Sequence, residues 1–156
     1  MISGKYLVAA AAVVALAAVA TWMHFAGSRP QGTEIRANAR DETQLLRGRA
    51  IYDQHCAACH GQKLEGQPDW RTRRPDGRMP APPHDDTGHT WHHPDAVLFG
   101  IVKYGLVPPY APAGYSSDMP AFRSTLTDDD IRVVLAFIES TWSPEIMKVR
   151  TEMIGQ

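Results

Sequence analysis

The chain has 156 residues, with 16 Lys and Arg against 17 Asp and Glu, which gives a formal net charge of −1. This length suits one domain with an appendage, and the near-neutral charge argues against a nucleic-acid binder. The charge is unevenly spread, because residues 28–80 carry three more basic than acidic side chains and residues 85–156 carry five more acidic than basic ones. This division is either ordinary solvated surface or a dipole that orients the protein toward a charged partner.

The first 27 residues form an apolar segment, in which residues 6–27 contain no Lys, Arg, Asp or Glu. An apolar run of about 20 residues is long enough to cross a bilayer as a helix, and Trp22 and Phe25 would then lie at the far interface. The alternative is a signal peptide that is cleaved near Ala20, after the small residues Ala18 and Ala20. Both interpretations predict export of the remaining chain.

Residues 28–42 are polar, include Pro30 and Gly32 and show no apolar period, so they are expected to form a flexible linker. Residues 43–156 are long enough to bury one hydrophobic core. The expected organisation is therefore a membrane anchor or signal sequence over 1–27, then the linker, then one domain.

A helix is expected to begin after Asp41, which suits an N-cap position shortly before an apolar pair. On this helix Gly48, Tyr52 and Cys56 recur every four residues and therefore share one face. A glycine inside a helix costs about 1 kcal/mol relative to alanine. Gly48 therefore indicates that another helix crosses this one closely.

The two cysteines of the chain, Cys56 and Cys59, lie three positions apart and are followed by His60. A disulfide between them would close too short a loop to stabilise the fold much. A thioredoxin-like redox pair is expected in a strand-rich context, which the flanking sequence lacks. A zinc site could recruit His55 and His60, but it is expected to have a second cysteine pair.

A covalently attached haem uses every residue of this stretch. About one helical turn separates the two thiols, so both can add to the vinyl groups of one haem, and His60 can ligate the iron from the same side. The sequence Cys-x-x-Cys-His is the attachment signal of c-type haem. We therefore predict one haem c, held through Cys56 and Cys59, with His60 as an axial ligand.

The second axial ligand must approach the iron from the opposite side of the ring, so the chain has to pass around the haem first. Met79 follows His60 by 19 residues in a stretch rich in proline and glycine, whereas Met119 follows it by 59 residues and after an expected helix. We therefore predict Met119, a thioether ligand that raises the reduction potential. An open site, Met79 and four histidines remain alternatives, the histidines being His84, His89, His92 and His93.

Three further helices are expected after the haem-attachment site. The first runs from Pro94 to Tyr104 and ends at Gly105. The second begins after Thr127, with the acids of Asp128–Asp130 in its first turn, where they suit the helix dipole. The third covers about 143–153, and its apolar face is expected to pack on the body of the domain.

His84, His89, His92 and His93 lie within ten residues, close to several aspartates. They could hold copper or zinc, which would make a copper-handling module an alternative function. Alternatively, the histidines bind no metal and have a structural role. One of them would then cap the following helix, while the others and Trp91 line the haem rim. The indole Nε1–H of Trp91 could then donate to a haem propionate, because a buried indole needs an acceptor.

Together these motifs resemble class I cytochrome c, especially its small bacterial forms. The resemblance rests on Gly48–Gly61 for the first helix and haem site, Asp118–Phe122 for the methionine-ligand loop and Leu126–Trp142 for the last helix. It implies an all-α fold in which the first and last helices cross around the covalently bound haem. It also implies that Gly48 faces an aromatic residue, here Phe137.

The resemblance further implies a proline whose carbonyl oxygen accepts a hydrogen bond from the ligand histidine. We assign this role to Pro82, which lies in the proline-rich stretch after Met79. Residues 62–80 depart from the family pattern, because they form an extended arginine-rich loop that the compact members lack.

The resemblance implies a one-electron carrier and not an enzyme, since His60 and Met119 fill both axial positions and leave no place for a small-molecule substrate. Expected partners are a bc1-type complex, a terminal oxidase or a periplasmic dehydrogenase. With an uncleaved helix the protein would span the bacterial inner membrane once and carry its haem domain in the periplasm, whereas cleavage near Ala20 would make it soluble and periplasmic. A haem enzyme or gas sensor with a labile sixth ligand is the alternative, besides copper handling.

Overall fold

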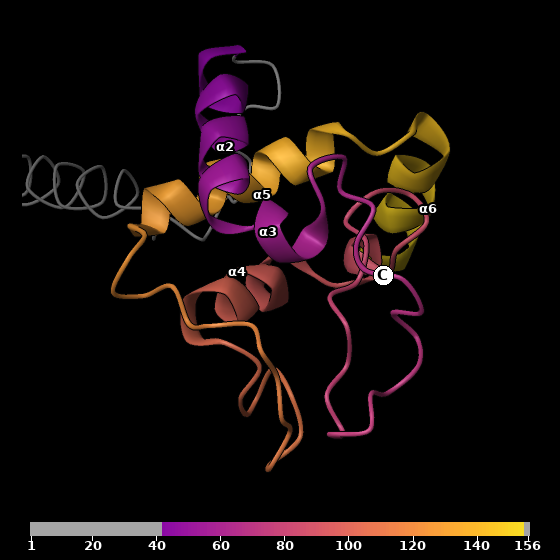
Figure 1. The fold of residues 1–156 in the computed structure, drawn as a ribbon. Coiled ribbons are helices and arrows are strands. Elements are labelled where there is room, and N and C mark those ends of the chain that lie inside the picture. The colour runs from indigo at the N-terminus through magenta and orange to yellow at the C-terminus, as the bar shows by residue number, and fades with distance from the viewer. Residues whose placement is uncertain (1–41, 155–156) are drawn as a thin grey trace, which may run out of the picture. The chain divides into compact units, whose positions relative to one another are not determined.

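The computed structural model describes residues 42–154. This part of the chain forms helices joined by long loops and contains no β-strand (Figure 1). In chain order the helices are α2 (Glu42–His55), α3 (Ala57–His60), the 3₁₀ helix η1 (Thr90–His92), α4 (Asp95–Tyr104), α5 (Asp128–Ser140) and α6 (Pro144–Ile154). The expected all-α architecture is therefore confirmed over the described residues.

The predictions for the N-terminal segment lie outside the described residues. They comprise the anchor or signal sequence over 1–27, cleavage near Ala20, nearly all of the linker over 28–42 and the N-cap at Asp41. The helix that was expected after Asp41 is α2, which begins at Glu42. Among the helices between residues 42 and 154, none is long and apolar enough to span a membrane.

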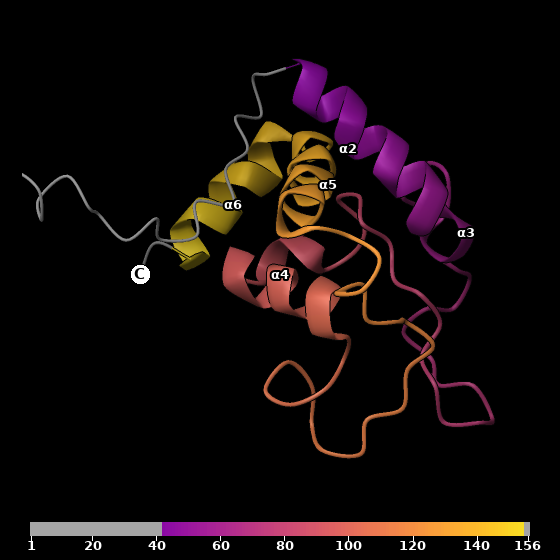
Figure 2. The ribbon, with the colours of Figure 1, turned by 90° about the vertical axis from the view of Figure 1, so that its left-hand side faces the viewer.

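The two longest helices, α2 and α5, cross at Gly48 (Figures 1 and 2). A Cβ atom at Gly48 would lie 2.3 Å from the carbonyl oxygen of Val133 and 2.8 Å from Cβ of Phe137. Both distances are well inside van der Waals contact, so only glycine allows the helices to come this close. The predictions of a close crossing and of Phe137 against Gly48 are confirmed.

Helix α5 begins at the capping residue that its sequence predicts. Thr127 Oγ1 accepts a hydrogen bond from the backbone N–H of Asp130 at 3.1 Å, and Asp130 Oδ2 accepts one from the Thr127 N–H at 3.0 Å. Because Thr127 donates to this carboxylate, the pKa of Asp130 lies below its ordinary value. Beyond the cap, the helix buries an apolar face that includes Ile131, Val134 and Ile138.

Helix α4 contacts α5 and ends at Gly105, as expected. The Gly105 N–H donates to the carbonyl oxygen of Ile101 at 2.8 Å, and the backbone then turns with a φ of +81°, a conformation that favours glycine. The ring of Tyr110, from the following loop, packs directly on Gly100, where a Cβ atom would lie 2.0 Å from the ring. The loop after α4 therefore folds back over its own helix.

Helix α6 follows α5 and contacts η1. Its main contact is Arg150, whose side chain is only 6% exposed. The guanidinium donates to the carbonyl oxygens of Trp91 at 2.8 Å and His93 at 2.7 Å, and it pairs with Asp95. It also lies 5.1 Å from the ring centre of Trp142. A buried cation with three hydrogen-bond acceptors thus connects α6 to the segment that leads into α4.

Two long loops leave the helices and meet near the bottom of Figure 1, residues 61–89 in magenta and residues 105–127 in orange. The base of the first loop is closed by two hydrogen bonds: the Gln67 N–H donates to the carbonyl oxygen of Ala81 at 2.9 Å, and the Ala81 N–H donates to Gln67 Oε1 at 2.9 Å. The loops contact each other through ion pairs to Asp118. Together with the helices they enclose a cavity.

Candidate haem-binding site

The cavity between the helices and the two loops has a volume of about 460 Å³, within the range of small-molecule and cofactor sites. Both cysteines line it, together with His60, Met79 and Met119. Apolar side chains form most of the remaining wall and come from α4, α5 and the loop between them, among them Leu98, Ile101, Val102, Phe122, Leu135 and Ile138. The cavity therefore combines an apolar interior with sulfur and imidazole groups.

Cys56 lies between α2 and α3, where the backbone keeps a nearly helical path. Its N–H donates to the carbonyl oxygen of Tyr52 at 2.8 Å, and its own carbonyl oxygen accepts from the His60 N–H at 2.9 Å. Both cysteines are free; Cys56 is half-buried and Cys59 is exposed. Burial, and then the neighbouring Cys59, raise the pKa of Cys56 to about 11, so this thiol stays protonated at neutral pH.

His60 is buried, and its ring is oriented by a hydrogen bond. Nδ1 lies 2.8 Å from the carbonyl oxygen of Pro82, and because a carbonyl can only accept, Nδ1 carries the proton. The other nitrogen, Nε2, then has a free lone pair. Burial lowers the pKa of His60, although the bond to Pro82 acts in the opposite direction. The ring is therefore a neutral imidazole with one nitrogen available to a metal.

His84 packs against the ring of His60, a contact that the sequence did not predict. The two rings are stacked, with 3.9 Å between their centres and 23° between their planes. His84 Nδ1 lies 2.7 Å from the hydroxyl of Thr90, and its backbone N–H donates to the carbonyl oxygen of Leu64 at 2.8 Å. Burial, and then the neighbouring His60, hold the pKa of His84 well below its ordinary value. A neutral imidazole thus fixes the position of the His60 ring.

Tyr52 connects the helix face to the turn after His60. Its side chain is fully buried, and its hydroxyl donates to the carbonyl oxygen of Gly61 at 2.8 Å. The ring also packs against Phe137, with 5.6 Å between the ring centres. The predicted shared face of α2 therefore runs from the helix crossing at Gly48 to the cavity at Cys56.

Met119 lies in the loop between α4 and α5 and is half-buried at the cavity wall. Its backbone N–H donates to Ser117 Oγ at 3.0 Å. Just after it, the loop is joined to the end of α4, since the Phe122 N–H donates to the carbonyl oxygen of Val102 at 3.0 Å. Met79 reaches the same cavity from the other loop. The structure thus brings both methionine candidates to the cavity, and the choice of Met119 stays a prediction.

The histidine cluster does not form the metal site that was considered as an alternative. Over residues 42–154, no three His, Cys, Asp or Glu side chains are grouped to hold a metal ion. His84 faces His60, His89 stacks on Trp70 with 5.2 Å between ring centres, and His92 packs on Trp91. His89 also packs edge-on against His93, with 5.4 Å between the ring centres, and His84, His89 and His93 line the cavity. Within residues 42–154 these contacts do not amount to a group of three metal ligands.

Trp91 is not among the residues that line the cavity, and its place at the haem rim stays a prediction. It packs against a core cluster that includes Trp142, and its buried Nε1–H has no hydrogen-bond partner in the described part of the chain. Trp70 lines the cavity instead, with the Arg71 guanidinium 4.0 Å from its ring centre. The extended loop of residues 62–80 therefore contributes an aromatic side chain to the cavity wall.

The chemistry of these side chains fits a haem attached through two thioether bonds. Two free thiols and a buried neutral imidazole come from one short segment, and a methionine thioether comes from a distant loop. Soft sulfur and imidazole donors are those that haem iron accepts as axial ligands. Cys56 and Cys59 would hold the group covalently, and His60 would bind its iron through Nε2.

Comparison with known proteins agrees with this chemistry. Residues 43–138 match the model of the family described as cytochrome C oxidase, cbb3-type, subunit III. Comparison with curated proteins and with solved structures found no match. The match covers α2 to α5 and most of the residues that line the cavity. The chain therefore belongs to this family of c-type cytochrome domains.

Proposed function

We propose that this domain is a one-electron carrier with a single haem c, ligated by His60 and Met119. Membership in the family implies haem-based electron transfer. When bound, the haem supplies an iron that changes reversibly between two oxidation states. The remaining tasks fall to the chain: it attaches the group, supplies two axial donors and keeps water from the iron.

The observation that carries this proposal is the geometry of His60. Its ring is buried, stacked on His84 and bonded through Nδ1 to Pro82, so these contacts fix one orientation of Nε2. A hydrogen bond to the second nitrogen of a metal-bound histidine sets its tautomer and strengthens it as a donor. The sixth position is then proposed for Met119, which lines the same cavity from a different part of the chain.

This arrangement favours electron transfer over chemistry at the iron. A thioether in the sixth position leaves no place for peroxide or a gas to bind, so the domain needs only an accessible edge. Cys59 is exposed, and it marks the rim where the attached group would approach solvent. A labile or absent Met119 bond would instead favour the haem enzyme or gas sensor, and the spectra proposed below separate these two cases.

We also propose that the apolar N-terminal segment holds the domain at the bacterial inner membrane, with the haem domain in the periplasm. An anchored domain meets membrane partners at a high effective concentration. Such partners would be a bc1-type complex, a terminal oxidase or a periplasmic dehydrogenase. Intact mass spectrometry of the membrane-extracted protein tests this, because cleavage near Ala20 would remove a defined mass and release the domain.

The ligand assignment is tested by Met119→Ala, with Met79→Ala as the matched control. The wild-type protein should be low-spin and six-coordinate and should show the methionine–iron charge-transfer band. Met119→Ala should lose this band and bind carbon monoxide rapidly, whereas Met79→Ala should keep the wild-type spectrum. Unchanged spectra in Met119→Ala, or loss of the band in Met79→Ala, would contradict the assignment.

A further inference from the structure

The arginine-rich loop of residues 62–80 has a defined internal structure. At its tip the Arg74 N–H donates to the carbonyl oxygen of Arg78 at 2.9 Å, and the Gly77 N–H donates back to the Arg74 carbonyl oxygen at 2.9 Å. Gly77 has a φ of +82°, which this tight turn requires. The turn therefore fixes the spacing between the Arg74 and Arg78 side chains.

These two arginines bind the same carboxylate in the other loop. Arg74 Nη1 lies 3.2 Å from Asp118 Oδ2, and Arg78 Nη1 lies 2.9 Å from Asp118 Oδ1. Each guanidinium thus contacts a different oxygen of one carboxylate. A third contact lies beside them, since the Arg73 guanidinium is 5.6 Å from the ring centre of Tyr115. The contacts join residues about forty positions apart, immediately before Met119.

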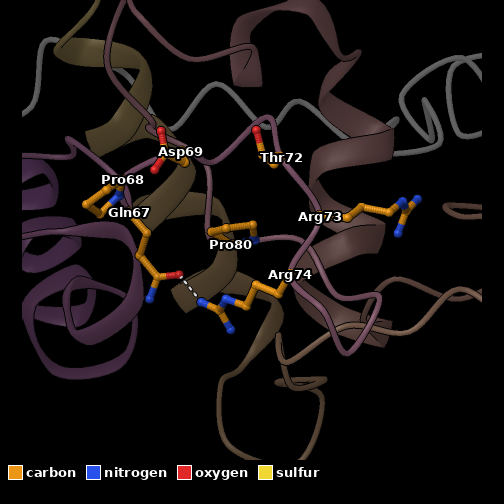
Figure 3. Close-up of a pocket in the computed structure, with 7 residues that line it drawn as sticks. All are labelled: Gln67, Pro68, Asp69, Thr72, Arg73, Arg74 and Pro80. Atoms are coloured by element: carbon orange, nitrogen blue, oxygen red, sulfur yellow. Dashed lines mark hydrogen bonds between the residues drawn. The ribbon is translucent and has the colours of Figure 1, made fainter.

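The Arg74 side chain is itself held in place by Gln67. Arg74 Nη2 donates to Gln67 Oε1 at 2.6 Å, and the same oxygen accepts from the Ala81 N–H. Figure 3 shows the Gln67 amide turned toward the Arg74 guanidinium, while Arg73 points away from it. Since Ala81 precedes Pro82, whose carbonyl oxygen binds His60, the polar contacts lead from the His60 side of the cavity to Asp118.

We propose that Asp118, held by Arg74 and Arg78, is a positioning residue that keeps the Met119 loop closed over the cavity. This inference rests on the proposed role of Met119 as the sixth ligand. Asp118 does not bind iron; it acts through the backbone that it shares with Met119. Breaking its ion pairs lets the loop open more often, so that an external ligand replaces the Met119 sulfur more readily.

The expected effect is moderate because the ion pairs are partly exposed. The side chains of Arg74, Arg78 and Asp118 are 39%, 44% and 49% exposed. Exposed pairs are weak individually, and salt screens them. For two pairs that share one carboxylate, we expect opening of the loop to become about 3- to 10-fold more frequent when the carboxylate is neutralised.

The test measures imidazole binding to the ferric haem-loaded protein, followed by loss of the methionine–iron band. Asp118→Asn and Arg78→Gln should each tighten imidazole binding, and the double variant should bind no more tightly than Asp118→Asn alone. Arg78 is preferred to Arg74 because it does not line the cavity. Asp118→Glu, which keeps the charge, should restore most of the wild-type affinity.

Lys63→Gln is the matched control, because it removes the same charge from the same loop at an exposed residue that does not line the cavity. It should leave imidazole binding unchanged. Salt gives a second readout, since raising the ionic strength to about 1 M shortens the Debye length to about 3 Å. The wild-type affinity should then approach that of Asp118→Asn, which should itself change little.

Two results overturn this inference while the ligand assignment stands. One is an affinity in Asp118→Asn equal to that of the wild type at low salt, and the other is an additive double variant, which would mean that Asp118 and Arg78 act separately. A wild-type spectrum without the methionine–iron band would overturn both proposals, and it is seen before any Asp118 variant is made. The two failures are therefore distinguishable.

Discussion

The crossing of α2 and α5 and the pair of loops around the cavity are stabilised by different forces. At the crossing, backbone meets side chain at Gly48, and the neighbouring Tyr52 and Val134 are fully buried. The loops meet through guanidinium and carboxylate groups that remain accessible to water. Apolar packing of this kind contributes several times more stability than an exposed ion pair.

Because of this difference, the two sides of the haem site should respond differently to mutation. The side that carries Cys56 and His60 belongs to the tightly packed helices, so its geometry changes only if the domain unfolds. The side that carries Met119 belongs to a loop that can open locally while the helices stay folded. Variants at the crossing should therefore change global stability, whereas variants in the loops should change ligand binding.

The largest effect is expected from Gly48→Val. The added side chain would meet the Val133 carbonyl and Phe137, so the helices must separate, and we expect a loss of about 3 kcal/mol or more in the free energy of unfolding. Urea unfolding of the haem-loaded protein measures it. Ala50→Val, on the exposed face of the same helix, is the control. Equal losses in both variants would mean that helix propensity, and not the crossing, sets the cost.

A smaller loss is expected from Arg150→Met. This change leaves two partly buried carbonyl oxygens and Asp95 without the donor that Arg150 supplies, and we expect the free energy of unfolding to fall by about 2 kcal/mol. Lys148→Met removes an exposed cation from the same helix and should cost much less. If Arg150→Met were neutral in thermal unfolding, α6 would not contribute to the packed helices.

Thr127→Ala should cost about 1 kcal/mol, the usual cost of losing an N-cap. The loss should depend on pH, because Thr127 lowers the pKa of Asp130 from its ordinary value of 3.8. A lowered carboxylate pKa stabilises the folded state fully above the ordinary value, and this stabilisation is lost as the pH falls through the folded-state value. The difference in the free energy of unfolding between the variant and the wild type should therefore become smaller below about pH 3.8. Thr125→Ala, at an exposed threonine nearby, should show no such trend.

The smallest change in stability is expected from Arg78→Gln. Loss of one exposed ion pair should alter the free energy of unfolding by less than about 0.5 kcal/mol, even though the same variant is expected to tighten imidazole binding. Urea unfolding and imidazole titration of one sample compare the two effects. A large loss of global stability would show that the loops and the helices unfold as one unit and would remove the distinction between them.

The sequence predicts those elements that local patterns specify. Three of these predictions rest on a single residue whose type suits one local backbone geometry. They are the N-cap at Thr127, the helix end at Gly105 and the close crossing at Gly48. The hydrogen bond from His60 to Pro82 is present as the resemblance implied.

Contacts that depend on distant parts of the chain were not predictable in this way. Nothing near His84 in the sequence indicates that its ring stacks on His60, and nothing near Trp70 indicates that its side chain lines the cavity. The apolar face expected on α6 is also only partly correct. Ile146 packs against the core, but Met153 stays 46% exposed, and the buried Arg150 adds polar contacts that the sequence did not predict.

Leu64, whose carbonyl oxygen holds the backbone of His84, has a left-handed backbone with a φ of +64°. An L-amino acid pays about 1–2 kcal/mol for this conformation, yet the side chain is 95% buried and gains about as much from the core. Leu64→Gly would remove the cost of the left-handed backbone but would also remove the packing of the side chain in the core. A D-leucine, introduced by chemical ligation, would favour the left-handed backbone, and comparing its stability with those of the glycine variant and the wild type would separate the backbone cost from the packing gain.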